Sequence, residues 1–275
     1  MSFKNILDLH VHTDNSFDGH HSAIFLCETA VEKGMRAVAF TDHVEMDFFR
    51  ENHFDRTARQ SYFEVVKARS AFTGKLIVCA GLELGQPTYN LPDSEHLVQL
   101  YSYDVIIASI HNLRNQKDFY YLRREGTLPD EDIDAMLREY FSEMLQLVQW
   151  GKFNVLAHLT YPLRYLHNAQ GLGKINMQPY AEIIDAILET TAKNQLALEI
   201  NTAGLRQDYN QLTPDEAIVR RFRELGGQRI TFGSDAHYAH NLGQDIERGM
   251  EVALRCGFEN VTLFQKREAM EVPIC

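Results

Sequence analysis

The stretch ILDLHVHTDNSFDGHHS, residues 6–22, contains four of the twelve histidines of this 275-residue chain. His10 and His12 stand one residue apart in an otherwise apolar run, where polar imidazole side chains are uncommon. In an extended strand, alternate side chains point to the same side. The stretch therefore predicts a buried strand that ends in two histidines facing one space.

Short apolar runs rich in β-forming residues recur along the chain, and segments of helical periodicity separate them. Strands are expected at 6–12, 37–43, 76–84, 104–111, 154–159, 196–201 and 229–237. Helices are expected at 22–33, 57–72, 94–101, 131–150, 178–194, 214–225 and 242–256. This alternation is typical of parallel strands covered by helices. We predict an α/β fold, a closed or nearly closed βα barrel of seven units in a single domain spanning 1–275, with an open doubly wound sheet as the alternative.

Two of these helices have clear sequence patterns. In 131–150, apolar residues recur at steps of three and four and predict one buried stripe: Ile133, Met136, Leu137, Tyr140, Phe141, Met144, Leu147 and Val148. In TPDE, residues 213–216, Thr213 is a candidate cap, Pro214 suits the first turn and Glu216 completes a capping box. The segment 112–130 is longer than an ordinary βα loop, so we expect it to cover an active site.

Composition limits the partners. The net charge of −11 and the lack of a basic stripe argue against a nucleic-acid partner. No run approaches the roughly 20 apolar residues that cross a bilayer, and the first residues do not resemble a signal peptide, so no membrane partner is expected. The four scattered cysteines form no CxxC pair and are expected to be reduced thiols of a cytoplasmic protein.

Residues that bind metals or carry protons recur where the predicted strands end. Each alone is more often a hydrogen-bonded core residue than a ligand, but in a parallel barrel all these ends open on one face. Clustered there without compensation, they would cost several kcal/mol in desolvation and repulsion. Several divalent cations would remove that cost, and mixed imidazole and carboxylate ligands suit zinc, manganese or iron. The residues are His10, His12, Asp42, His43, Glu83, His111, His158, Asp235 and His237.

The motifs HVHTDNSFDG, FTDH, GLE, SIH, AHL and GSDAH, in this order, resemble those of the PHP (polymerase and histidinol phosphatase) superfamily. The resemblance runs from about residue 6 to the C-terminus and is greatest to the monofunctional histidinol-phosphate phosphatases. It implies a distorted (β/α)7 barrel that holds three divalent metal ions.

Matched motif by motif, the resemblance also implies the ligands. The first ion would be held by His10, His12, Glu83 and Asp235, and the second by Glu83, His111 and His158, with Glu83 bridging the two. The third would be held by His43, His237 and a residue of the SFDGHH loop. For this last ligand we favour Asp18, with His20 and His21 as alternatives. Asp235, His237 and Glu83 are the candidate catalytic residues.

Two segments narrow the substrate. LTYPLRY (159–165) and NTAGLRQ (201–207) each follow a predicted strand and carry one arginine, Arg164 and Arg206. Guanidinium groups match phosphate oxygens in pairs, and similar segments hold the substrate phosphate in the histidinol phosphatase branch. A surface salt bridge is the alternative for each arginine. Asp8 is expected either to orient a liganding histidine or to be a paired core carboxylate.

These features predict a metal-dependent L-histidinol-phosphate phosphatase of histidine biosynthesis, in which a metal-bridging hydroxide attacks the phosphorus of a small phosphomonoester. The general acid and the oligomeric state stay open. The alternatives are a PHP-type phosphoesterase acting on another monoester or diester, an amidohydrolase-type barrel, and a metal-binding module without catalysis. The amidohydrolase alternative is disfavoured because DVIIASIH (104–111) lacks the lysine often found at a middle strand end of such barrels.

Overall fold

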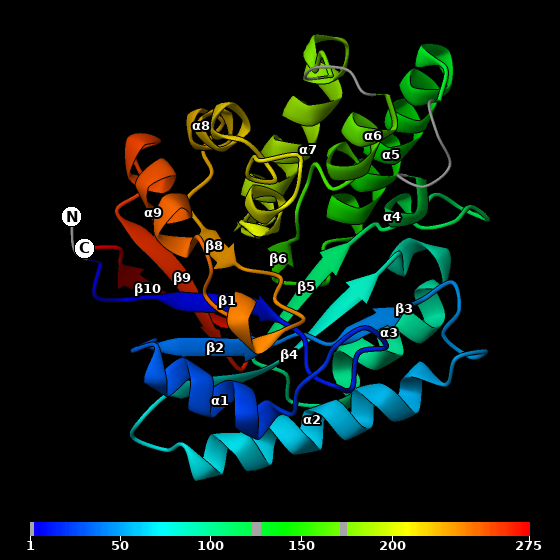
Figure 1. Ribbon diagram of the computed structural model, residues 1–275. Helices are drawn as coiled ribbons and strands as arrows, with labels where there is room; N and C mark the ends of the chain where they lie inside the picture. The colour runs from blue at the N-terminus through cyan, green and yellow to red at the C-terminus, as the bar shows by residue number, and fades with distance from the viewer. Residues whose placement is uncertain (1–2, 123–127, 171–174) are drawn as a thin grey trace.

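The computed structural model describes residues 3–122, 128–170 and 175–275, and it contains a parallel sheet that curls into a nearly closed barrel (Figure 1). Neighbouring strands follow the order β1-β2-β4-β5-β6-β7-β8, which is also their order along the chain. The strands are β1 (Leu7–Val11), β2 (Ala37–Phe40), β4 (Ile77–Gly85), β5 (Val105–Ser109), β6 (Val155–Leu156), β7 (Ala197–Asn201) and β8 (Ile230–Gly233). All seven coincide with predicted strands.

The barrel closes where the first strand meets the segment after the last one. Val11 and Ala236 form an isolated parallel bridge. The amide of His12 donates to the carbonyl of Ala236 at 3.0 Å, and the amide of Asp235 donates to the carbonyl of His10 at 2.9 Å. The short strand β3 (His43–Glu45) pairs with β4 beyond the end of β2. The predicted distorted barrel is therefore confirmed, and the open-sheet alternative is wrong.

The predicted helices surround this sheet, as Figure 1 shows. They are α1 (Ala23–Glu32), α2 (Phe54–Ala71), α3 (Leu91–Leu100), α5 (Asp130–Trp150), α7 (Ala181–Lys193), α8 (Glu216–Glu224) and α9 (Ile246–Arg255). Two short helices, α4 (Phe119–Leu122) and α6 (Leu163–Gln170), are additional. The expected stripe of α5 is buried except for Met136, which is half-buried. Within the described residues, no helix is both long and apolar enough to span a membrane.

The start of α8 differs from the prediction. Asp215, not Thr213, caps the helix, because its side chain accepts a hydrogen bond from the amide of Ile218 at 3.1 Å. Thr213 is buried instead, and its hydroxyl lies 2.8 Å from Nη2 of Arg164. The predicted cap was wrong because Thr213 and Asp215, two positions apart, are both residue types that cap helices, and Asp215 is the one that directly precedes the first helical residue.

A C-terminal hairpin, β9 (Asn260–Gln265) and β10 (Glu268–Pro273), was not predicted. Its turn residues, Lys266 and Arg267, have φ values of 50° and 67° without the glycine or asparagine that usually marks such a turn. The amide of Arg267 donates to the carbonyl of Asp104, which stands just before β5. The hairpin therefore lies at the amino-terminal end of the barrel and leaves the carboxyl ends of the strands free.

Candidate metal centre

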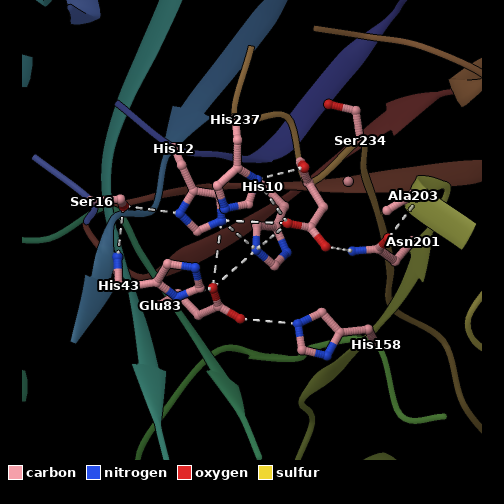
Figure 2. Close-up of polar contacts among 12 residues, drawn as sticks. His10, His12, Ser16, His43, Glu83, His158, Asn201, Ala203, Ser234 and His237 are labelled. Carbon is pink, nitrogen blue, oxygen red and sulfur yellow. Dashed lines mark hydrogen bonds and ion pairs between the residues drawn. The ribbon is translucent and has the colours of Figure 1, made fainter. Parts of the chain in front are cut away.

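Glu83 lies at the middle of the predicted cluster of ligands. It stands near the end of β4 and is fully buried. One carboxylate oxygen is 3.1 Å from Nε2 of His111 and 3.0 Å from Nε2 of His158. The other is 3.2 Å from Nε2 of His10, 3.5 Å from Nε2 of His12 and 2.9 Å from Nδ1 of His43. Figure 2 shows the imidazoles of His10, His12, His43 and His158 around this carboxylate.

Separate strand ends bring these side chains together, and two of them lie on unusual backbone. His158, after β6, has φ 22°, and Asp235, after β8, has φ 54°. Non-glycine residues in this region cost of order 1–3 kcal/mol each and cluster at functional sites. Asp235 is 3.5 Å from Nε2 of His12 and 3.7 Å from Nδ1 of His237. The turns after these strands therefore direct their side chains into the barrel mouth.

The spacing of the side chains fits metal ions. Within each of four groups of three residues, the candidate ligand atoms lie within 4.8 Å of one another. Ligand atoms 2.0–2.1 Å from a tetrahedral ion are about 3.4 Å apart, which matches the separations around Glu83. The groups are His10, His12 and Glu83; His10, His158 and Asp235; His43, Glu83 and His111; and His12, His43 and His237.

The position of Asp18 distinguishes it from its alternatives. Its carboxylate lies 3.1 Å from Nε2 of His237 and 3.8 Å from Nε2 of His43. His20 stacks on Tyr238 with 4.0 Å between ring centroids, and His21 packs against Phe25. Of the three, Asp18 therefore lies where a ligand shared with His43 and His237 would have to be.

Three imidazoles are oriented by a partner on the nitrogen that faces away from Glu83. Nδ1 of His10 lies 2.7 Å from Glu199, Nδ1 of His12 lies 3.1 Å from the hydroxyl of Ser16, and Nδ1 of His111 lies 3.0 Å from Glu45. Such contacts fix the tautomer and leave Nε2 as the metal-binding atom. Of these partners, Glu199 and Glu45 are carboxylates that the sequence analysis missed.

Glu199 had a weak sequence signal. It is a single acidic residue inside the apolar run LALEIN, two positions before Asn201. A Cβ atom at Gly233 would lie 2.2 Å from the Glu199 carboxylate and 2.5 Å from Cβ of His10, so the glycine of GSDAH leaves room for this pair. Glu45 has no comparable sequence signal, because it lies in the short strand β3, which the sequence analysis did not predict.

The carboxylates of Asp8 and Asp42 accept hydrogen bonds from backbone amides instead of facing the candidate metal ligands. Asp8 accepts hydrogen bonds from the amides of Ser234 and Gly243, each at 2.8 Å, so of the two roles weighed for it the paired core carboxylate is the one observed. Asp42 accepts from the amide of Thr13 and from the hydroxyl of Ser16. Both carboxylates therefore fix loops that carry candidate ligands.

Charge at the centre is set by burial and by neighbours. Burial acts to raise the pKa of Glu83, but the imidazoles of His10, His43 and His111 bring it well below its ordinary value. Burial lowers the pKa of His12 and His158, which favours the neutral imidazole that coordinates metals. For His10, His43 and His111, burial acts to lower the pKa, but the neighbouring carboxylates raise it well above its ordinary value. The cluster therefore offers an ionised carboxylate beside two neutral nitrogen donors, and a metal ion would displace the protons of the other three imidazoles.

A cavity of about 1620 Å³ opens above this cluster and includes both predicted arginines in its lining. Arg164, in the first turn of α6, is buried and donates to Asp235 at 3.0 Å and to Asn201 at 2.6 Å. Arg206 ends a short 3-10 helix, Ala203–Arg206, and donates through Nη2 to the carbonyl of Asp235. Among the described residues, its buried Nη1 has no hydrogen-bond partner.

Part of the long 112–130 segment also lines this cavity, through residues including Asn112, Gln116 and Tyr121. The described part of this segment therefore lies over the site, as the sequence predicts. Residues 123–127 of the segment lie outside the described part of the chain.

The barrel and its crowded strand ends define a metal-binding α/β barrel protein. The chain belongs to the PHP domain family, whose model matches residues 8–203. It is 29% identical over 262 residues to a probable histidinol-phosphatase of Thermotoga maritima, covering 95% of this chain and 97% of that protein. It is 25% identical over 263 residues to the histidinol-phosphatase of Lactococcus lactis, covering 94% of each.

A solved structure has the same fold. It is the crystal structure of a histidinol phosphate phosphatase from Lactococcus lactis complexed with zinc, L-histidinol and phosphate. The two chains superpose with a TM-score of 0.80 at 24% identity, over 98% of this chain and all of the other. The likeness confirms the barrel fold.

Proposed function

We propose that this protein is a metal-dependent phosphomonoesterase that converts L-histidinol phosphate and water to L-histidinol and phosphate. One observation carries the chemistry: Glu83 lies within 3.5 Å of five imidazoles at the base of a cavity that Arg206 also lines. The substrate is proposed because relatives that match nearly their whole length bear the name histidinol-phosphatase.

The residues suit three ions in the sets that the motifs imply. His10, His12, Glu83 and Asp235 would hold one, Glu83, His111 and His158 a second, and His43, His237 and Asp18 a third. Divalent zinc, manganese or iron bound there would lower the pKa of a coordinated water toward 7 and offset charge on the phosphoryl oxygens.

The arginines have different shares in binding the phosphate. Nη1 of Arg206 has no hydrogen-bond partner among the described residues, and a phosphate oxygen reaching it would supply a charge-assisted one. Most donors of Arg164 are engaged by Thr213, Asp235 and Asn201. We therefore assign direct phosphate binding mainly to Arg206, and to Arg164 a smaller share together with the orientation of Asp235.

Asp235 and His237 line the cavity as well as the ligand cluster. They therefore lie between the residues that would hold the ions and the space where the phosphoryl group would lie. This position supports their role as catalytic residues with Glu83. The protein is further proposed to act in the cytoplasm on a small molecule, in accord with four unpaired cysteines, of which only Cys275 is exposed.

Phosphate release by the purified, metal-loaded protein tests this proposal. L-histidinol phosphate should be hydrolysed with a higher kcat/KM than other monoesters and than bis(p-nitrophenyl) phosphate, and a chelator should abolish turnover. Elemental analysis of the same sample should find several divalent ions per chain. Faster hydrolysis of another ester, with no phosphate released from L-histidinol phosphate, would overturn the proposal.

A further inference from the structure

Four carboxylates line the large cavity: Asp18, Glu45, Asp118 and Asp235. Three of them lie beside candidate metal ligands, because Asp18 faces His237, Glu45 faces His111 and Asp235 faces His12. Asp118 forms no ion pair with a histidine, lysine or arginine among the described residues. It is therefore a negative charge in the cavity that the metal centre leaves unused.

Asp118 is held in place through one of its two oxygens. Oδ1 accepts hydrogen bonds from the hydroxyl of Tyr161 at 2.9 Å and from the amide of Tyr120 at 2.7 Å. Within the described residues, no hydrogen bond reaches Oδ2. The side chain is thus fixed but keeps an acceptor that none of the described residues uses. Burial raises the pKa of this carboxyl, an effect that a bound cation would oppose.

Tyr161 sets the position of Asp118 relative to the metal centre. Its ring centroid lies 5.0 Å from those of His111 and His158, while its hydroxyl contacts Asp118. The carboxylate is therefore about one aromatic side chain away from the two histidines beside Glu83. A small molecule with its phosphate between the ions and Arg206 could place another group against Asp118.

We propose that Oδ2 of Asp118 binds the protonated amine of the substrate and so makes the enzyme selective for aminoalkyl phosphates. This inference rests on the proposed function. A carboxylate repels phosphate and attracts an ammonium group, and a charge-assisted hydrogen bond between them gives direction as well as affinity. Asp118 is thus a specificity-determining residue that does not touch the reacting phosphorus.

The test pairs a change in the protein with the matching change in the substrate. L-histidinol phosphate is compared with 3-(imidazol-4-yl)propyl phosphate, which lacks only the amine. The wild-type protein should prefer L-histidinol phosphate in kcat/KM by about 30-fold to 100-fold. Asp118→Asn, which keeps an acceptor for Tyr161 and Tyr120, should reduce that preference to less than 5-fold and leave kcat/KM for the amine-free ester within 3-fold.

Two further variants check that the loss of preference comes from the carboxylate of Asp118. Asp118→Ser retains an oxygen for the amide of Tyr120 and should lose the preference in the same way. Asp55→Asn removes a charge from an exposed residue of α2 outside the cavity lining and should retain it. An unchanged preference in Asp118→Asn, or an equal loss on both esters, would overturn the inference alone. Failure of the wild-type protein to hydrolyse either ester would overturn the proposed function as well.

Discussion

The two ends of the barrel each bury a carboxylate, and they satisfy it in opposite ways. At the amino-terminal end, Asp104 accepts hydrogen bonds from the amides of Ala80 and Lys266 and pairs with Arg69. At the carboxyl-terminal end, Glu83 is surrounded by imidazoles, and no backbone amide or arginine among the described residues reaches it.

This contrast separates a structural carboxylate from a ligand. The donors of Asp104 are fixed in place by the fold and carry their protons at any ordinary pH. The partners of Glu83 are themselves ionisable groups whose nitrogen lone pairs need either protons or metal ions. The same residue chemistry therefore stabilises the protein at one end and prepares a binding site at the other.

The largest expected effect comes from removing the charge of Glu83. Glu83→Gln should lower kcat/KM for L-histidinol phosphate roughly 1,000-fold or more, because the proposed bridge between two ions is lost. Elemental analysis should show the loss of at least one ion per chain. Full metal content with wild-type turnover would remove Glu83 from the centre and erase the contrast with Asp104.

The converse change affects stability without affecting the site. Asp104→Ala should lower the free energy of unfolding by about 3 kcal/mol, because Arg69 and the amides of Ala80 and Lys266 lose their partner. Urea denaturation followed by circular dichroism measures this loss. The folded fraction should keep wild-type kcat/KM and metal content, and a parallel loss of metal would show that the two ends are not independent.

A smaller effect is expected one layer outside the ligands. Glu199→Gln should weaken metal binding about 10-fold to 100-fold, since Glu199 orients His10 through its Nδ1. Competition with a chromophoric chelator gives the affinity, and the chain should stay folded. If the affinity were unchanged, the carboxylate would be a core residue like Asp104 rather than part of the centre.

The smallest effect tests burial itself. Asp185 pairs with Arg221 on the exposed surface, 2.7 Å apart. Asp185→Asn should leave both the denaturation midpoint and kcat/KM unchanged within error, because exposed ion pairs contribute little. This variant is a matched control for both ends of the barrel, and a clear destabilisation would mean that burial is not what distinguishes them.

The sequence allowed prediction of the barrel because its strands are continuous apolar runs, and of the site because ligand residues repeat at their ends. His10, Glu83 and Asp235 needed only the rule that parallel strands end on one face. Their assignment to particular ions remains a prediction, as does the single domain spanning 1–275.

What the sequence concealed depended on distant partners. Glu199 is 189 residues from His10, and a lone acidic residue in a strand does not show which side chain it will meet. The hairpin β9–β10 lacks ordinary turn residues at Lys266 and Arg267. The roles proposed for Arg164 and Asp118 depend on their contacts with Asp235 and Tyr161, which no local sequence pattern encodes.

The junction between β1 and the segment after β8 also affects when the protein can acquire its ions. Asp8 bonds Ser234 across 226 residues of chain, and His10 shares a ligand group with Asp235. Contacts this distant form slowly, because the intervening chain must first be ordered. We therefore expect no N-terminal fragment that ends before Asp235 to retain the ions, so that metallation reports a correctly closed barrel.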